Sequence, residues 1–173
     1  MEVVSGSIGH EKVHYKAVPL EKLDDDIKKF LKYCNESSES IYIKSAIAHI
    51  WFVIIHPYDD GNGRIARAIT DYILSQNTST TKFKLYSIST AISNDRIGYY
   101  NILDRSTNLF LNKDYDLTPW LEWHLNILNN AMKQALKNIE YIIQKTKFWD
   151  IYRNHSLNDR QIKVLNKILD VGV

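Results

Sequence analysis

The stretch from 41 to 56, IYIKSAIAHIWFVIIH, limits the fold more than any other part of the sequence, because it is apolar on nearly every side of a helix. Such a helix is stable only when protein surrounds it, so the pattern predicts a central, buried helix. Pro57 disfavours helical geometry in the residue before it and is expected to end this helix. The run at 46–55 is too short for a bilayer, which needs about 20 residues, so no membrane contact is expected.

The remaining segments predict an all-α protein with one small β-hairpin near the N-terminus. Strand-like residues around two glycines indicate the hairpin, at residues 3–17. Apolar residues at helical spacing indicate further helices at 20–34, 64–76, about 94–104, from Thr118 as N-cap to 146, and from a cap at Ser156 or Asn158 onward. The side chains of the helix at 64–76 that are expected to face inward are Ile65, Ile69, Tyr72 and Ile73.

Length and composition bound the domain count and the cellular setting. The 173 residues suit one main domain with an appendage, expected at 1–147 and 148–173. A net charge of +2 gives no sign of a nucleic-acid or membrane partner, and the single cysteine, Cys34, excludes an internal disulfide. That cysteine usage and the lack of a signal-peptide pattern at the N-terminus predict a cytoplasmic protein.

The segment HPYDDGNGRIAR, residues 56–67, combines features that favour anion binding. Gly61 and Gly63 can adopt left-handed backbone angles, so successive N–H groups can curl into an anion-binding nest. The nest leads into a helix N-terminus, whose free N–H groups and dipole favour negative charge. Arg64 and Arg67 are three residues apart and project from one face, where their guanidinium groups suit phosphate oxygens. Together these features predict a polyphosphate site.

Three further side chains of the segment supply chemistry beside that site. Asp60 would repel bound phosphates unless a Mg²⁺ ion lay between them, so it is a candidate metal ligand. Asn62 has an amide that can donate to a phosphate oxygen. His56 ends the buried helix and can take a proton from an attacking hydroxyl. The combination favours transfer of a phosphorus-containing group from a nucleotide to a hydroxyl.

Each feature taken singly has an ordinary structural explanation. A Gly-Asn-Gly is usually a turn, a His-Pro is usually a helix stop, and paired arginines usually form a solvated face. Their occurrence in one contiguous loop, in a chemically sensible order, favours function instead. Outside the loop, His49 is predicted to be a hydrogen-bonded core histidine. Tyr99 and Tyr100 fit either a nucleotide-site lining or ordinary helix packing.

The segment HPYDDGNGRIAR resembles the signature of the Fic family, His-Pro-Phe-x-Asp/Glu-Gly-Asn-Gly-Arg-x-x-Arg, with Tyr58 in place of phenylalanine. The similarity extends over roughly residues 3–145. It implies an all-α Fic-type bundle with a β-hairpin flap, and an enzyme that moves AMP from ATP to a Ser, Thr or Tyr hydroxyl of a target protein.

By matching position, the resemblance also implies residue roles. His56 would be the general base, and Asp60 would hold Mg²⁺. The α- and β-phosphates would be bound by Gly61, Asn62, Gly63 and Arg64, and the γ-phosphate by Arg67. The kinase-like branch of the family has lysine where Gly63 stands, so this glycine favours AMP transfer over phosphate transfer.

The resemblance further implies partners. The flap at 3–17 would clamp an extended segment of the target protein by main-chain pairing. The inhibitory helix of many relatives, Ser/Thr-x-x-x-Glu-Gly/Asn, has no match here, so Arg67 is expected to be unpaired, unless a separate inhibitory partner or a missing segment supplies the helix. The segment at 148–173 resembles the first helix of a winged-helix domain, but one helix without a recognition helix makes DNA binding by this chain unexpected. Homodimer formation stays open.

Other functions remain alternatives on the same residues. The chain could be a nucleotide-binding regulatory module without a target-competent flap. It could be a toxin-type Fic protein held inactive by a partner. It could also remove AMP, or transfer another phosphate-containing group, because Fic-type sites are known for both.

Overall fold

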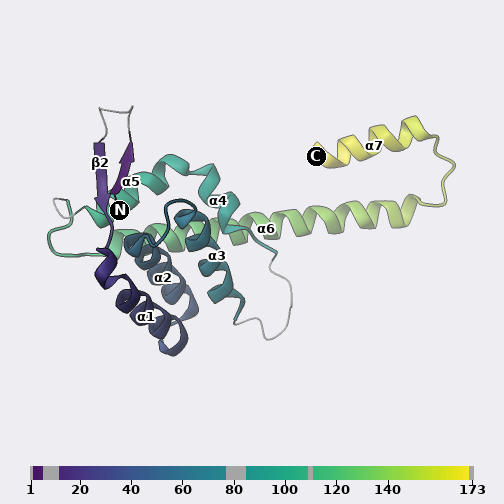
Figure 1. Cartoon of the computed structure of the whole chain (residues 1–173). Helices are drawn as coiled ribbons and strands as arrows, with labels where there is room; N and C mark the ends of the chain where they lie inside the picture. Colours follow the sequence, from purple (N-terminus) through teal and green to yellow (C-terminus); the bar gives the residue numbers. More distant parts are fainter. Residues whose placement is uncertain (1, 6–11, 77–84, 109–110, 172–173) are drawn as a thin grey trace. The chain divides into compact units, whose positions relative to one another are not determined.

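The computed structural model describes residues 2–5, 12–76, 85–108 and 111–171 (Figure 1). Within these ranges the chain is mainly helical. Its elements are β1 (Glu2–Ser5), β2 (Lys12–Lys16), α1 (Leu20–Glu36), α2 (Ile41–Ile55), α3 (Asn62–Ser75), α4 (Ile88–Asn94), α5 (Arg96–Thr107), α6 (Thr118–Tyr152) and α7 (Asp159–Val171). None of the helices in these ranges is both long enough and apolar enough to cross a membrane.

β1 and β2 form a two-stranded antiparallel ladder in the region where the hairpin was predicted. Glu2 pairs with Lys16 and Val4 with Val13, with an irregularity between Val3 and Val4. β2 also contacts α5. The predicted turn, bracketed by Gly6 and Gly9, lies outside the described residues. The strand pairing is therefore part of the fold, whereas the role of a flap is a separate question.

The chain divides into two compact units, Met1–Ala131 and Met132–Val173. The helix α6 contributes its first part to unit 1 and the rest to unit 2. The domain boundary expected between 147 and 148 falls inside this continuous helix and stays a prediction.

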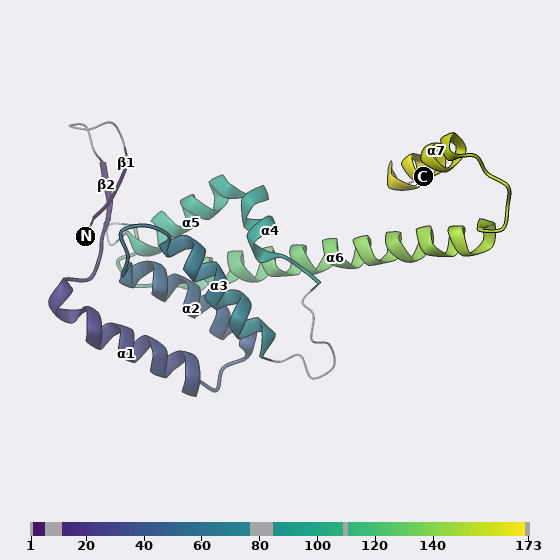
Figure 2. The ribbon, with the colours of Figure 1, turned by 45° about the vertical axis from the view of Figure 1, so that its right-hand side comes forward.

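α2 is the central helix of unit 1, as its apolar sequence predicts. It contacts both α1 and α3 (Figures 1 and 2). Half or more of its residues are buried, and Trp120 of α6 donates a hydrogen bond from Nε1 to the backbone oxygen of Ala46, 2.9 Å away. The hydrophobic core around it consists of Phe30, Ala48, Phe52, Ile55, Ala66 and Ile73. α2 is thus held on several sides, which fixes the position of the loop that follows it.

α3 begins two residues earlier than predicted, at Asn62, and its inward face differs from the prediction at one position. Ile73 is buried, but Tyr72 is 64% exposed, so its expected inward orientation was wrong. The buried stripe of α3 instead runs through Asn62, Ala66 and Thr70. Small and polar residues in such a stripe carry no hydrophobic signal, which is why an apolar pattern misplaced the face.

Two helix starts also differ from the sequence prediction. α4 was not predicted, although Ser87 caps it by accepting a hydrogen bond from the backbone N–H of Thr90, 3.1 Å away. Thr118 is the first residue of α6 and not its cap, because the oxygen of Leu117 accepts the first helical hydrogen bond. α4 has only seven residues, too few for helical periodicity to stand out.

Unit 2 is a pair of helices, the C-terminal part of α6 and α7. Asn158 caps α7 by exchanging two hydrogen bonds of 2.9 Å with Gln161, which decides between the two predicted caps. Lys145 and Asp170 form an ion pair at 2.6 Å, and Trp149 donates to Asn166 at 3.1 Å. These polar contacts hold α7 against α6.

Candidate active site

The loop from 56 to 61 turns the chain between α2 and α3. α2 ends at Ile55, and His56 takes the left-handed conformation, with φ 49° and ψ 58°. A residue other than glycine in this region costs about 1–3 kcal/mol and persists only where the surroundings impose it. The imposed backbone follows from Pro57, which disfavours continuing the helix, and from the hydrogen bond of the His56 N–H to the oxygen of Phe52, 3.1 Å away.

The imidazole of His56 is held by the helix that it terminates. Its Nδ1 atom lies 3.2 Å from the backbone oxygen of Val53, one turn back. A carbonyl oxygen can only accept a hydrogen bond, so Nδ1 must carry the proton of the neutral ring. Nε2 then keeps its lone pair. The half-buried ring therefore presents a proton-accepting nitrogen from a fixed position.

The N-terminus of α3 carries no side-chain cap. Its N-cap residue is Gly61, in the left-handed conformation with φ 87° and ψ 0°, and the oxygen of Gly61 accepts from the N–H of Ile65. The three preceding N–H groups, those of residues 62–64, have no partner within the helix. By contrast, serine or aspartate side chains cap α2, α4 and α5. The start of α3 is thus open to an anion.

Both predicted arginines lie over this open helix end. A Cβ atom added to Gly61 would lie 3.4 Å from Nη2 of Arg64, and one added to Gly63 would lie 3.7 Å from Nη1 of Arg67. The two guanidinium groups therefore fold back along the first turn of α3. In the described part of the chain, no carboxylate forms an ion pair with Arg67. This arrangement concentrates positive charge at the free N–H groups.

Asp60 stands at the edge of the same site. One carboxylate oxygen accepts from the N–H of Gly61 at 2.6 Å, and the other pairs with Arg64 at 2.8 Å. The side chain is 92% exposed, so both oxygens have further lone pairs open to solvent. Among the described residues there is no group of three or more His, Cys, Asp or Glu that could cage a metal. A single carboxylate next to a phosphate site nevertheless suits Mg²⁺, which commonly combines one or two carboxylates with substrate phosphates.

Asn62 closes the loop from inside. It is 2% exposed, and its amide accepts from the N–H of Tyr58 at 3.1 Å and donates to the oxygen of Tyr58 at 2.5 Å. Sequence reasoning missed this role and assigned the amide to a phosphate. One of the two N–H donors of the amide is used by Tyr58, and the phosphate contact of Asn62 stays a prediction.

A buried polar chain lies behind the loop, where His49 was predicted to be a hydrogen-bonded core histidine. That prediction is confirmed, because Thr70 and Tyr99 contact its two ring nitrogens at 3.0 and 3.1 Å. Burial raises the pKa of Tyr99 to about 12 and lowers the pKa of the neighbouring His124 to about 4. Tyr99 is thus a packing residue 4% exposed to solvent, while Tyr100 is 54% exposed.

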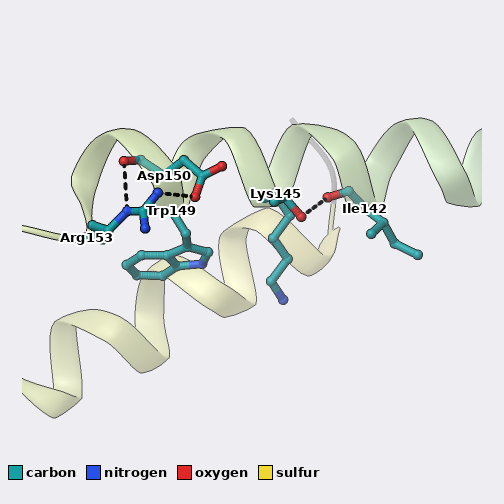
Figure 3. Close-up of a pocket in the computed structure, with 6 residues that line it drawn as sticks. Ile142, Lys145, Trp149, Asp150 and Arg153 are labelled. Carbon is teal, nitrogen blue, oxygen red and sulfur yellow. Dashed lines mark hydrogen bonds and ion pairs between the residues drawn. The ribbon is translucent and has the colours of Figure 1, made fainter.

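A surface groove on unit 2 shares no lining residue with the motif loop. Figure 3 shows it along the C-terminal part of α6, with Arg153 bonded to Asp150. Its lining residues are Ile142, Lys145, Thr146, Trp149, Asp150 and Arg153. None of them belongs to the motif, so the candidate active site rests on the loop geometry and not on this groove.

Comparisons with known proteins agree with the motif. Residues 3–74 match the family profile described as Fic/DOC family. A "Uridine 5'-monophosphate transferase" of Xanthomonas campestris pv. campestris is 34% identical over 67 residues, 34% of this chain and 12% of the relative. A "probable protein adenylyltransferase" of Aquifex aeolicus is 44% identical over 43 residues, 25% of this chain and 13% of the relative.

A similar solved structure extends the agreement to the fold. It is a Fic family protein from Desulfovibrio desulfuricans G20, with a TM-score of 0.63 and 26% identity, covering 75% of this chain and 38% of that one. The chain spans only about an eighth of the length of the two curated relatives. The matching profile includes the motif loop, and the chain is similar to the Fic/DOC family over residues 3–74 and to a Fic family protein in its fold.

Proposed function

We propose that this protein is a nucleotidyltransferase that moves AMP from ATP to a hydroxyl side chain of a target protein. One observation carries the proposal. The N-terminus of α3 has no side-chain cap, and two guanidinium groups lie over it. It begins six residues after His56, whose Nε2 is left free to accept a proton. An anion site beside a base is what attack of a hydroxyl on a phosphate requires.

The phosphates of the nucleotide would bind at the first turn of α3. Backbone N–H groups of Asn62, Gly63 and Arg64 would donate to the α- and β-phosphates, together with the guanidinium of Arg64. Arg67, which has no ion-pair partner among the described residues, would meet the γ-phosphate. Hydrogen bonds to charged groups contribute about 1.5–3 kcal/mol each, so this set can hold a triphosphate.

His56 would act as the general base. As the hydroxyl oxygen of the target attacks the α-phosphorus, its proton passes to Nε2 of His56. A new oxygen–phosphorus bond forms, the bond from the α-phosphorus to the bridging oxygen breaks, and pyrophosphate leaves. The bond of Nδ1 to Val53 keeps the ring oriented for this transfer.

Asp60 would hold Mg²⁺ against the phosphates. When bound, the ion would neutralise phosphate charge and stabilise the leaving pyrophosphate. Asp60 can serve only if its contact with Arg64 loosens, and the exposure of both side chains makes that inexpensive, since exposed ion pairs contribute about 0–1 kcal/mol.

The strand pair β1–β2 would be the flap that receives the target protein. A two-stranded ladder has unpaired N–H and C=O groups along its outer edges. An extended segment of the target can add to such an edge as a further strand. Main-chain pairing of this kind depends on the target's backbone more than on its side chains. Other contacts would therefore select the target protein.

UMP transfer is the second candidate, favoured by the name of the Xanthomonas relative. The phosphate site described above would serve UTP as well as ATP, because it contacts no base. The two candidates therefore differ only in the nucleotide base.

Labelled donors separate the candidates. The chain is incubated with Mg²⁺ and a cell extract, in parallel with ATP labelled on the α-phosphate, UTP labelled on the α-phosphate and ATP labelled on the γ-phosphate. AMP transfer labels protein only from the first donor, and labelling only from the second would assign UMP transfer. Labelling from the γ-phosphate would contradict nucleotidyl transfer, and binding of ATP without any labelling would favour a regulatory module.

A further inference from the structure

Three helices of unit 1 meet at one buried histidine, behind the motif loop. Nδ1 of His49 in α2 lies 3.0 Å from Oγ1 of Thr70 in α3, and Nε2 lies 3.1 Å from the hydroxyl of Tyr99 in α5. His49 and Thr70 are fully buried, and Tyr99 is 4% exposed. Each polar atom of the histidine ring therefore has one partner, and each partner belongs to a different helix.

The directions of the hydrogen bonds that link Tyr99, His49 and Thr70 follow from one fixed donor, the Thr70 hydroxyl. The hydroxyl of Thr70 donates to the backbone oxygen of Ala66 at 3.0 Å, so its oxygen must accept from Nδ1–H of His49. Burial lowers the pKa of His49 well below its ordinary value, so the ring is neutral. Nε2 then accepts from the hydroxyl of Tyr99. Tyr99 thus donates to His49, His49 donates to Thr70, and Thr70 donates to the backbone of α3.

The hydrogen bond between His49 and Thr70 joins α2 to α3 at one defined point, within a seam that the apolar core also holds. His49 stands seven residues before His56 in α2, and Thr70 stands seven residues after Gly63 in α3. Seven residues span two helical turns, about 10 Å, on both helices. Because the helices run antiparallel across the loop, the same register that joins His49 to Thr70 sets His56 opposite the first turn of α3.

We propose that His49 is a positioning residue, which holds the general base His56 in register with the phosphate site at the start of α3. The inference rests on the proposed function, since that function gives His56 and the helix start their roles. His56, the C-cap residue of α2, is the only proposed catalytic or binding group that this helix positions. The phosphate-binding groups all come from residues 60–67, and Asn62 ties its part of the loop only to Tyr58.

This division predicts a distinctive kinetic signature. Loss of the His49–Thr70 bond removes no hydrogen bond of Asp60, Arg64 or Arg67, so ATP affinity should hold. The distance from His56 to the reacting phosphate should change, and a misplacement of about 1 Å can cost about 10²-fold in rate. A merely structural role would lower the melting temperature without this split between kcat and nucleotide affinity.

Thr70→Val tests the inference, because valine keeps the shape and removes the hydroxyl. Thr70→Ser keeps the hydroxyl and serves as the rescue variant. Thr107→Val is the matched control, since Thr107 donates the same kind of bond to the oxygen of Leu103, at 2.8 Å, but has no histidine partner among the described residues. Tyr99→Phe, which removes only the outer bond, is the second variant in case Thr70→Val does not fold.

The first measurement compares kcat with ATP affinity, determined by calorimetry, well below the melting temperatures. Thr70→Val is expected to lower kcat at least tenfold with ATP affinity changed less than twofold, and Tyr99→Phe to lower kcat by a smaller factor. Thr70→Ser and Thr107→Val are expected to keep both values. An unchanged kcat in folded Thr70→Val, or an equal loss of ATP affinity, overturns the inference.

The second measurement needs neither nucleotide nor activity. NMR should show a slowly exchanging Nδ1–H of His49 in the wild type, and nuclear Overhauser contacts between the end of α2 and the first turn of α3. Thr70→Val should lose the former and weaken the latter. Unchanged contacts overturn the register role whatever the chain's activity. Altered contacts in a protein that transfers no nucleotide uphold the register role and contradict the proposed function alone.

Discussion

Nδ1 of His56 lies 3.2 Å from the backbone oxygen of Val53, so the helix that ends at the histidine also orients its ring. The same three residues of spacing place the ring over the last turn of α2. The position of the proposed general base therefore depends on where the central helix ends.

This contact predicts the tautomer of the histidine. In the neutral ring of His56 the proton should be on Nδ1, because only a donor can pair with the Val53 oxygen. Long-range ¹⁵N–¹H NMR spectra distinguish the two ring nitrogens directly. The exposed His155, whose ring lies 5.3 Å from that of Tyr152 at a tilt of 59°, provides a comparison within the same sample. A proton found on Nε2 of His56 would contradict the assignment of this nitrogen as the base.

The two motif glycines should respond differently to alanine. Gly61→Ala forces a Cβ into the left-handed region and should lower the free energy of unfolding by about 1 kcal/mol. Gly63→Ala places its Cβ 3.7 Å from Arg67, an ordinary contact, and should leave stability unchanged or slightly higher.

Both glycine variants should weaken ATP binding, because each adds a methyl group where phosphates would approach the backbone. Urea unfolding measures the stability difference, and calorimetry measures the ATP affinity. A Gly63→Ala variant that binds ATP as tightly as the wild type would place the phosphates elsewhere.

Asn62 should stabilise the loop through its two hydrogen bonds with Tyr58. Asn62→Asp replaces the donor facing the Tyr58 oxygen with a buried carboxylate oxygen, and should lower the free energy of unfolding by about 3 kcal/mol. The exposed Asn101→Asp is the control and should change stability by less than about 0.5 kcal/mol. Equal urea midpoints for the two variants would mean that the amide pair does not hold the loop.

His124 should make the fold sensitive to acid. Burial lowers its pKa from the ordinary 6.5 to about 4, so the unfolded chain binds a proton that the folded chain does not. Its neutral form thus contributes stability that is fully present above about pH 6.5 and is lost as the pH falls toward 4. The loss amounts to about 3 kcal/mol over that window.

The variant His124→Leu isolates this contribution. Both ring nitrogens of His124 are buried without a hydrogen-bond partner among the described residues, so an apolar side chain should be tolerated near pH 7. Urea unfolding between pH 7 and 4 should show a shallower pH dependence than in the wild type. His155→Gln, at an exposed site, should follow the wild type. Parallel profiles for His124→Leu and the wild type would rule out a neutral buried His124.

The sequence was most informative where residue types have one strong structural preference, as a long apolar run and a proline do. The apolar run at 41–55 predicted a buried central helix, and Pro57 predicted its end. It was least informative where polar residues serve the interior. Thr70 and Asn62 are buried in α3 through hydrogen bonds to His49 and to Tyr58. Spacing along one helix does not reveal such partners, because they come from other segments.

The site shows the same division. The motif order predicted a general base, a metal-binding acid and two phosphate-binding arginines. The structure brings these residues, His56, Asp60, Arg64 and Arg67, to the ends of two adjoining helices. The ion pair between Asp60 and Arg64 was not foreseen, because Arg64 was assigned to a phosphate and Asp60 to Mg²⁺, although their four-residue spacing suits an ion pair on a helix. Selection between adenine and uracil nucleotides would depend on residues that the motif does not include.

The most direct test of the account removes the proposed base and keeps the phosphate site. ATP labelled on the α-phosphate is supplied with Mg²⁺ and a cell extract to the wild type and to His56→Ala, with ATP affinity measured on both. With His56 as the general base, label transfer should fall by about 10²–10⁴-fold while ATP affinity stays within twofold. Label transfer by His56→Ala at the wild-type rate would contradict it.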